Sequence, residues 1–225
     1  MISVCLVVYQ RPHRVKKIME QLLKQTVDYF DVYIWDNTGN KAKLDIGAFP
    51  KEKCIIHKSE SNIGSQARFR LAAMTTGKQI IFIDDDMNLK PDFIEYNYTQ
   101  HMKFGFNCVL GWYSKKFNSE DYRDANGRLP CGQKVDYIGT GGMIIDREIF
   151  DTYTTLQDLL PEFAKCEDLY LCYLAQKFGM KMISIDSKCS IENDGLDQYG
   201  KLKKYKQDAF KLLRGKGYRL LRDDE

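Results

Sequence analysis

The 225-residue sequence contains no apolar run that approaches the ~18–20 residues needed to cross a bilayer, and we therefore expect no transmembrane segment. Its opening, MISVCLVVYQRPHR, places apolar residues before the charges and offers no small-residue cleavage site, unlike a signal peptide. With 34 Lys and Arg against 31 Asp and Glu, the net charge of +3 is too small and too evenly spread for a nucleic-acid-binding surface. Only five prolines and no low-complexity tract occur, which argues against disorder.

Histidine and paired cysteine motifs are also scarce. The three histidines are scattered, and the seven cysteines form an odd set without a CxxC pair, so neither a zinc site nor a disulfide framework is predicted. Several cysteines lie inside apolar segments, where a thiol behaves as a small hydrophobic group. These features favour reduced thiols and a cytoplasmic location.

Three motifs for phosphate or acyl chemistry are missing. The sequence has no GxxxxGK[ST] loop and no GxGxxG after its first strand, so a glycine-rich turn that cradles phosphate is excluded. It also lacks GxSxG, the motif of many serine hydrolases. Any phosphate-binding chemistry must therefore come from other residues.

The first hundred residues alternate between buried strands and amphipathic helices. The first strand is a continuous apolar run, ISVCLVVY, which is typical of a strand buried on both faces. Strands are predicted over residues 2–9, 31–36, 53–57 and 79–84, and helices over 15–23 and 65–76. This spacing predicts βαβ units and a mainly parallel sheet with helices on both faces.

The second half of the chain is less regular. We expect strands over 108–112, 137–146 and 181–185, a helix over 171–178, and a polar excursion across the surface over 115–134. No internal repeat or linker is visible. One α/β domain with an irregular C-terminal half is the predicted architecture.

The strongest chemical signal is the triplet Asp84-Asp85-Asp86 at the end of the strand QIIFID. In open parallel sheets, ligands bind beyond the carboxyl ends of the strands. Asp84 and Asp86 are two residues apart, so in an extended segment their side chains point the same way. Because adjacent carboxylates repel each other, a divalent cation with oxygen ligands is the favoured partner. Solvated loop acids, one of them capping a helix that Pro91 begins, are the alternative.

A calcium loop is a second alternative, because Asp84, Asp86 and Asn88 are followed by Glu95. An EF-hand needs glycine at its sixth position and a helix before the loop. This chain has Leu89 at that position and a β-branched strand before it, and Pro91 follows, so the calcium reading fails.

Six motifs in order resemble glycosyltransferases of family 2 and related families with the GT-A (Rossmann-like) fold. They are VVYQRP (7–12), VYIWDN (32–37), SNIGSQAR (61–68), FIDDDM (82–87), GTGGMIIDREIF (139–150) and CEDLYLCYLAQKFG (166–179). Each motif is weak alone, but six in the family's order are specific. Within this group, the sequence also resembles the N-terminal domain of chlorovirus capsid-glycan glycosyltransferases.

The resemblance implies a role for each matching residue. The nucleotide-sugar pocket would be formed by Tyr9, Arg11, Asp36, Arg68, Asp84 and Asp85. The metal, Mn²⁺ or Mg²⁺, would be held by Asp86 and Asp84, and the acceptor side would be formed by Gly141, Gly142 and Trp112. The acidic pair at the start of a helix would supply the catalytic base, Asp168, with Glu167 as the alternate.

These residue types suit the implied reaction, an inverting transfer from a nucleoside-diphosphate sugar, UDP favoured, to a hydroxyl of a glycan or glycoprotein acceptor. The diphosphate leaving group needs its charge neutralised, and the acceptor hydroxyl needs a carboxylate to take its proton. Many relatives use a histidine after the catalytic helix as a further metal ligand, and none occurs after His101. Glu192, Asn193 or Asp194 could replace it, or the metal keeps a water.

Simpler readings of these residues stay open. The Glu167-Asp168 pair could be favourable acids in the first turn of a helix, and Asp36 could be a turn former. Arg68 could be an exposed helix charge, and Trp112 could be a core aromatic. A catalytically silent nucleotide- or glycan-binding domain of the same fold is therefore the alternative function.

The resemblance divides the single domain, 1–225, into a nucleotide-binding half (1–100), an acceptor and catalytic half (101–195) and a basic C-terminal helical tail (196–225). Residues 201–222 hold nine Lys and Arg and one acid, Asp208. An apolar stripe at helical spacing (Leu202, Tyr205, Ala209, Leu212 and Leu213) predicts that this tail docks on the domain with a solvated basic face. Peripheral membrane contact is the alternative.

Overall fold

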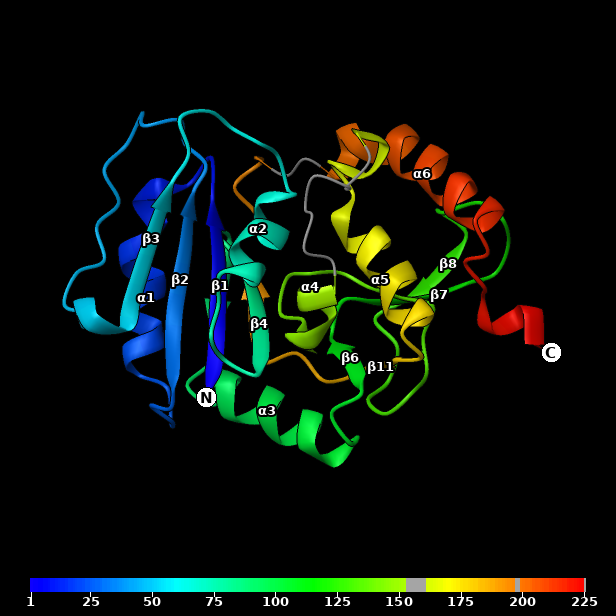
Figure 1. The fold of residues 1–225 in the computed structure, drawn as a ribbon, viewed down its shortest axis with the longest axis horizontal. Helices are drawn as coiled ribbons and strands as arrows, with labels where there is room; N and C mark the ends of the chain where they lie inside the picture. The colour runs from blue at the N-terminus through cyan, green and yellow to red at the C-terminus, as the bar shows by residue number, and fades with distance from the viewer. Residues whose placement is uncertain (153–160, 197–198, 225) are drawn as a thin grey trace.

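A seven-stranded sheet crosses the computed structural model, which describes residues 1–152, 161–196 and 199–224 (Figure 1). Across the sheet the strands are β11 (Lys181–Ser184), β6 (Cys108–Gly111), β10 (Ile144–Asp146), β4 (Gln79–Asp84), β1 (Ile2–Val8), β2 (Phe30–Asp36) and β3 (Cys54–Lys58). All neighbours are parallel except β10, which is antiparallel to both β4 and β6. The predicted mixed, mainly parallel sheet is confirmed.

Helices cover both faces of this sheet. They are α1 (Val15–Leu23), α2 (Ala67–Ala73), α3 (Phe93–Lys103), α4 (Glu148–Thr152), α5 (Glu167–Lys177) and α6 (Lys203–Gly215). Short 3₁₀ turns lie at Pro12–Arg14, Lys51–Lys53, Pro161–Phe163, Tyr199–Leu202 and Leu221–Asp224.

Strand β1 is covered by helices on both faces, and all of its residues except Ser3 are apolar. Val4 and Leu6 belong to the core beneath α1 and α3, whereas Cys5 and Val7 belong to the core beneath α2 and α5. Successive side chains of a strand point to opposite faces, so a strand covered on both sides needs no polar positions.

Most residues of the stretch 115–134 are exposed or half-buried, as the polar sequence predicts, but part of the stretch forms strands. It contributes to a three-stranded antiparallel sheet of β7 (Ser114–Phe117), β8 (Ala125–Gly127) and β9 (Tyr137–Ile138). Phe117 and Tyr122 are each 1% exposed and pack against Phe210 of α6. The predicted surface path is confirmed for most of the stretch, and its few apolar residues are buried by a helix far away in the sequence.

The predicted strand over 137–146 is divided in two. Residues 137–138 form β9 of the small sheet, and 144–146 form β10 of the large one. Between them the backbone turns through Gly142, whose φ of +83° lies in the left-handed region that favours glycine. A further two-stranded sheet joins β5 (Met87–Leu89) to β12 (Cys189–Ile191). The turn between β9 and β10 and the β5–β12 sheet both bring loops to the carboxyl end of β4.

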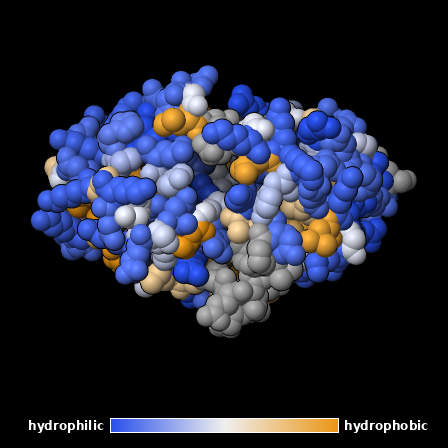
Figure 2. Space-filling view, turned by 90° about the horizontal axis from the view of Figure 1, so that it is seen from above, coloured by the Kyte–Doolittle hydropathy of each residue, from blue (hydrophilic) through white to orange (hydrophobic). Residues whose placement is uncertain are grey.

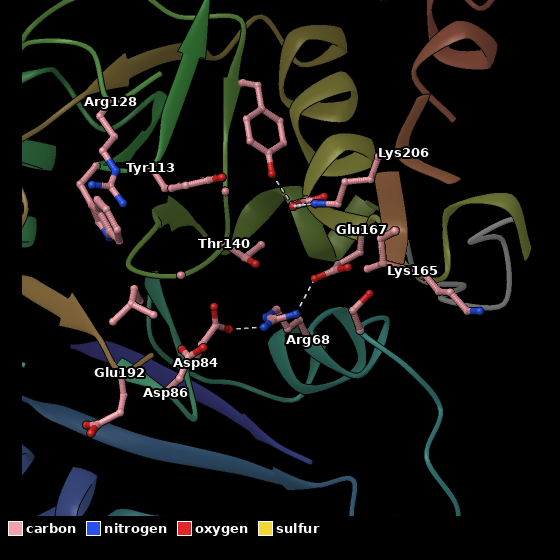
Figure 3. Close-up of a pocket in the computed structure, with 18 of the residues that line it drawn as sticks. Arg68, Asp84, Asp86, Tyr113, Arg128, Thr140, Lys165, Glu167, Glu192 and Lys206 are labelled. Atoms are coloured by element: carbon pink, nitrogen blue, oxygen red, sulfur yellow. Dashed lines mark hydrogen bonds and ion pairs between the residues drawn. The ribbon is translucent and has the colours of Figure 1, made fainter. Parts of the chain in front are cut away.

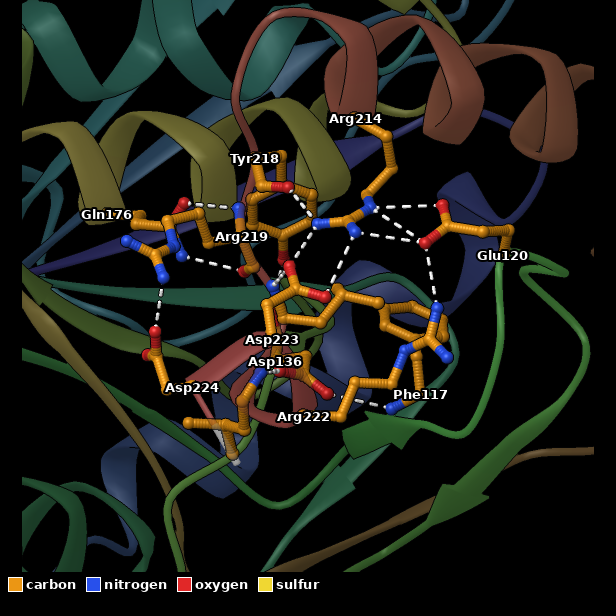
Figure 4. Close-up of polar contacts among 12 residues, drawn as sticks. Phe117, Glu120, Asp136, Gln176, Arg214, Tyr218, Arg219, Arg222, Asp223 and Asp224 are labelled. Atoms are coloured by element: carbon orange, nitrogen blue, oxygen red, sulfur yellow. Dashed lines mark hydrogen bonds and ion pairs between the residues drawn. The ribbon is translucent and has the colours of Figure 1, made fainter.

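The C-terminal tail packs on the small sheet and α5. Helix α6 buries Ala209, Phe210 and Leu213, whereas Leu212 of the predicted stripe stays exposed. Part of its basic charge is paired, because Lys206 binds Asp168, and Arg214 binds Glu120 and, within the tail, Asp223 (Figure 4). The prediction of a solvated basic face is therefore only partly confirmed.

None of the helices in the described ranges is long and apolar enough to span a membrane. All seven cysteines are unpaired, and five of them are buried.

Candidate active site

Two cavities of about 560 and 530 Å³ meet at the carboxyl ends of β1 and β4 and form one cleft. We call the first, which Tyr9 and Arg11 line, the strand-end cavity, and the second, which Glu167 and Asp168 line, the acid-pair cavity. They share Ser65, Arg68, Asp84, Asp86, Lys165 and Leu202. The cleft opens on the face seen in Figure 2, and Figure 3 shows the acid-pair cavity.

The three aspartates at the carboxyl end of β4 have different surroundings. Asp85 turns toward the end of β1, where its two oxygens accept hydrogen bonds from the Tyr9 amide at 3.0 Å and from Arg11 Nη1 at 3.1 Å. Asp84 and Asp86 line both cavities, as their two-residue spacing predicts. Asp85 therefore anchors the loop that carries Tyr9 and Arg11.

The surroundings of Asp84 and Asp86 fit a divalent cation. Oδ1 of Asp86 is buried and has no hydrogen-bond partner among the described residues. Burial and the neighbouring Asp84 raise the pKa of Asp86 to about 6, and a bound cation would reverse this effect. Gly141 leaves room beside the pair, since a Cβ there would lie 2.7 Å from Oδ2 of Asp84. Carboxylate oxygens are the donors that Mg²⁺ and Mn²⁺ prefer.

A third carboxylate ligand is not preformed. Asp194 pairs with Arg11 through two bonds of 2.6 and 2.7 Å, and Glu192 accepts a bond of 2.5 Å from Arg14. Within the described ranges, no three His, Cys, Asp or Glu side chains are grouped as a metal site. The cation would therefore take its remaining ligands from phosphate oxygens and water, as Mg²⁺ commonly does.

The first acid of the pair on α5 is joined to the aspartates by an arginine. Arg68 Nη1 donates to Glu167 Oε1 at 2.5 Å, and Arg68 Nη2 donates to Asp84 (Figure 3). Glu167 is 3% exposed. Burial raises its pKa against the attraction of Arg68, and the adjacent Asp168 raises it further. One guanidinium thus connects the candidate metal site to the candidate base.

The second acid, Asp168, is held by groups from two other elements. Its Oδ2 accepts hydrogen bonds from the Tyr137 hydroxyl and from Lys206 Nζ, the latter at 2.8 Å. Burial alone would raise the pKa of Asp168, but the Lys206 ammonium and these hydrogen bonds outweigh burial and hold the pKa below its usual value. Asp168 is therefore an anion at neutral pH. The helix N-terminus adds to this, because the Leu169 amide donates to Oδ1 at 2.7 Å.

A second lysine lies near this network. Lys115 of β7 has its ammonium 3.9 Å from the ring centre of Tyr122 and 5.6 Å from that of Tyr137. Burial and repulsion from Lys206 lower its pKa to about 8, while Asp168 acts in the opposite direction.

This pKa predicts a pH-dependent gain from Lys115→Met. Below pH 8 the folded protein holds the Lys115 ammonium in an unfavourable buried position. Between pH 8 and 10.5 the folded protein loses this proton before the unfolded chain does, so the contribution of Lys115 to the free energy of unfolding of wild type rises with pH. The variant should therefore gain about 1–2 kcal/mol at pH 7 and much less at pH 10. Urea unfolding at both values measures this. A loss of stability at pH 7 would contradict it.

Most of the sequence-predicted residues line the cleft. Tyr9, Arg11, Arg68 and the three aspartates line the strand-end cavity, while Glu167, Asp168, Gly141 and Trp112 line the acid-pair cavity. Two residues do not line either cavity. Asp36 is 1% exposed and accepts two bonds from Thr38, and Gly142 packs against the Trp112 ring, where a Cβ would lie 2.9 Å away.

Sequence reasoning missed Lys206, Arg14 and Tyr137. A signal for Lys206 was present, because it is spaced at helical intervals from Ala209, Phe210 and Leu213 on the buried face of α6. A lysine on an apolar helix face needs a carboxylate partner. Arg14 carried no such signal, since its bonds to Glu192 and to backbone oxygens of Asp85 and Met87 depend on the tertiary fold.

Comparison with known families gives this site a context. Residues 3–159 match the model of glycosyl transferase family 2. The chain belongs to this family. The match includes the aspartates at the carboxyl end of β4, while the acid pair of α5 lies beyond it.

Solved structures show the same fold as this family 2 domain. Residues 1–349 of S. aureus TarS superpose with a TM-score of 0.63 at 15% identity, covering 85% of this chain and 60% of that one. The same fragment in complex with UDP gives 0.60 at 14% identity over 83% and 58%, and in complex with UDP-GlcNAc 0.61 at 15% over 83% and 56%. The predicted GT-A fold is confirmed. The chain covers about 60% of the TarS fragment's length.

A search of curated proteins found no match. The resemblance to chlorovirus enzymes is not supported by any of these comparisons.

Proposed function

We propose that this protein is a metal-dependent glycosyltransferase that moves a sugar from a nucleoside diphosphate, UDP favoured, to a hydroxyl of a glycan or glycoprotein acceptor with inversion. One observation carries the proposal: the carboxylates at the end of β4 and the acid pair of α5 line one cleft, and Arg68 bridges Asp84 to Glu167. Family membership and the UDP and UDP-GlcNAc complexes of TarS support the donor class. The unpaired cysteines are compatible with the cytoplasmic location that we include in the proposal.

In this proposal the strand-end cavity holds the nucleoside diphosphate. Asp84 and Asp86 would hold Mn²⁺ or Mg²⁺, which would neutralise charge on the leaving diphosphate. Arg68 lines both cavities, so its guanidinium lies where it would contact the diphosphate or the departing oxygen. Asn37 replaces Asp36 as the residue of this segment that reaches the nucleotide, because only Asn37 lines the cavity.

The acid-pair cavity then holds the donor sugar and the acceptor. Asp168 is ionised and lies at the wall of this cavity, and it would take the proton of the acceptor hydroxyl as that oxygen attacks the anomeric carbon. The bond to the diphosphate oxygen breaks as the new glycosidic bond forms. Single displacement needs no covalent nucleophile. Glu167, with its raised pKa and its bond to Arg68, stays the alternate base.

Release of UDP tests this function directly. UDP-sugars are supplied with Mn²⁺ or with EDTA, and UDP is measured for wild type, Asp84→Asn and the exposed-loop control Asp45→Asn. We expect metal-dependent release that Asp84→Asn abolishes and Asp45→Asn leaves unchanged. Donor binding without any release or transfer would favour the catalytically silent domain.

A further inference from the structure

A third cavity, of about 590 Å³, lies beside the acid-pair cavity. Its walls are residues 128–130 and the segments 185–187 and 189–191, together with Trp112. It shares Trp112, Arg128 and Ile191 with the acid-pair cavity. The two cavities therefore adjoin each other, and Arg128 lies where they meet.

Arg128 is arranged to present its donors to this junction. Its Cζ lies over the Trp112 ring, 5.2 Å from the ring centre, which is within the range of a cation–π contact. Among the described residues, no carboxylate forms an ion pair with Arg128. Other basic residues around the cleft, such as Arg68 and Lys206, do form ion pairs with carboxylates. A guanidinium that lies over an aromatic ring still has N–H groups that can bind a carboxylate or a phosphate. Figure 3 shows Arg128 on the opposite side of the pocket from Lys165 and Lys206.

The backbone of Arg128 is held in a conformation that arginine disfavours. Its φ is +55°, in the left-handed region. Two buried serines fix this turn. The Ser114 carbonyl accepts a hydrogen bond of 2.8 Å from the Arg128 amide, and the Ser114 hydroxyl accepts one of 3.0 Å from the Leu129 amide. Ser184 contacts the Ser114 hydroxyl at 2.9 Å and donates to the Leu129 carbonyl at 2.6 Å. Strained residues that the surroundings hold in place are concentrated at functional sites.

We propose that this third cavity is an acceptor subsite, and that Arg128 binds an acidic group, a carboxylate or a phosphate, carried by the acceptor next to its reacting unit. Calling the ligand an acceptor rests on the proposed function, but binding of an acidic group at Arg128 does not require turnover. One carboxylate, Asp186, also lines the cavity. It accepts a hydrogen bond of 3.4 Å from Tyr96, a residue of α3 that lies outside the cavity lining.

Tryptophan fluorescence tests the proposal. The chain has two tryptophans, so in a Trp35→Phe background Trp112 is the sole reporter. The probes are methyl β-D-glucuronide for the carboxylate, glucose 6-phosphate for the phosphate, and neutral methyl β-D-glucoside. We expect a saturable change with one or both acidic probes and none with the neutral probe at the same concentration. Arg128→Gln should weaken acidic binding about tenfold or more, because a charge-assisted contact is lost.

Two further variants separate binding from structure. Arg123→Gln, an exposed arginine paired with Asp121 outside all three cavities, should leave binding unchanged. Arg128→Gly should lose binding like Arg128→Gln and yet raise the melting temperature, because glycine tolerates the positive φ. Equal responses to neutral and acidic probes, or unchanged binding in Arg128→Gln, would overturn the proposal. Calorimetry with UDP on the same proteins reports separately on the donor site, so either idea can fail alone.

Discussion

Asp168→Asn should lower kcat about 10²–10⁴-fold and leave UDP affinity within about twofold. The loss follows from removing the group that takes the acceptor proton. The UDP affinity should persist because Asp168 lines only the acid-pair cavity, away from Tyr9 and Arg11. Steady-state kinetics and calorimetry measure the two quantities.

This substitution also leaves Lys206 buried without its anionic partner, which costs about 3–5 kcal/mol in comparable buried pairs. The double variant Asp168→Asn, Lys206→Met removes that unpaired ammonium. It should regain stability without regaining turnover. Glu167→Gln is the matched comparison on the same helix. If Asp168→Asn keeps wild-type turnover and Glu167→Gln loses it, the base is Glu167 and the assignment of Asp168 is wrong.

Phe210→Ala should lower the free energy of unfolding by about 3–5 kcal/mol. Phe210 is fully buried, and its ring centre lies 4.5 Å from that of Phe117 and 6.0 Å from that of Tyr122. Its removal leaves a cavity between α6 and the small sheet. Because α6 also carries Lys206, activity should fall along with stability as the helix loosens.

The control for this prediction is Leu212→Ala on the same helix. Leu212 is 37% exposed and should change stability by no more than about 0.5 kcal/mol. Urea unfolding of both variants and wild type gives the comparison. A change below 1 kcal/mol for Phe210→Ala would show that the tail contributes little to the fold, against the packing described above.

The parts of the fold that the sequence predicts are those set by local pattern. Strand β1 was predictable because a nearly continuous apolar run is stable where both of its faces are buried, between two layers of helices. The place of Asp84 and Asp86 followed from a topological rule, since strands of a parallel sheet deliver their carboxyl ends to one edge. Neither inference needed a contact between distant segments.

The rest depended on such contacts. Lys206 contacts Asp168, 38 residues away in the sequence, and Arg14 contacts Glu192, 178 residues away. The local sequence around either basic residue does not indicate which carboxylate it contacts. The division of residues 137–146 between two sheets likewise follows from packing, because Gly139 and Gly142 admit the rings of Tyr113 and Trp112 where any side chain would collide. The glycines were visible in the sequence, but what they made room for was not.

We propose that Asp84 and Asp86 hold a divalent cation that recruits a nucleoside diphosphate to the strand-end cavity. Calorimetric titration of UDP into wild type, Asp86→Ala and the control Asp45→Ala, each with Mn²⁺ and then with EDTA, tests it most directly. We predict binding that needs both the metal and Asp86 and is unaffected by Asp45→Ala. UDP binding that survives EDTA and Asp86→Ala would contradict the metal site, and absence of binding by UDP, GDP, dTDP and CDP would contradict the donor site.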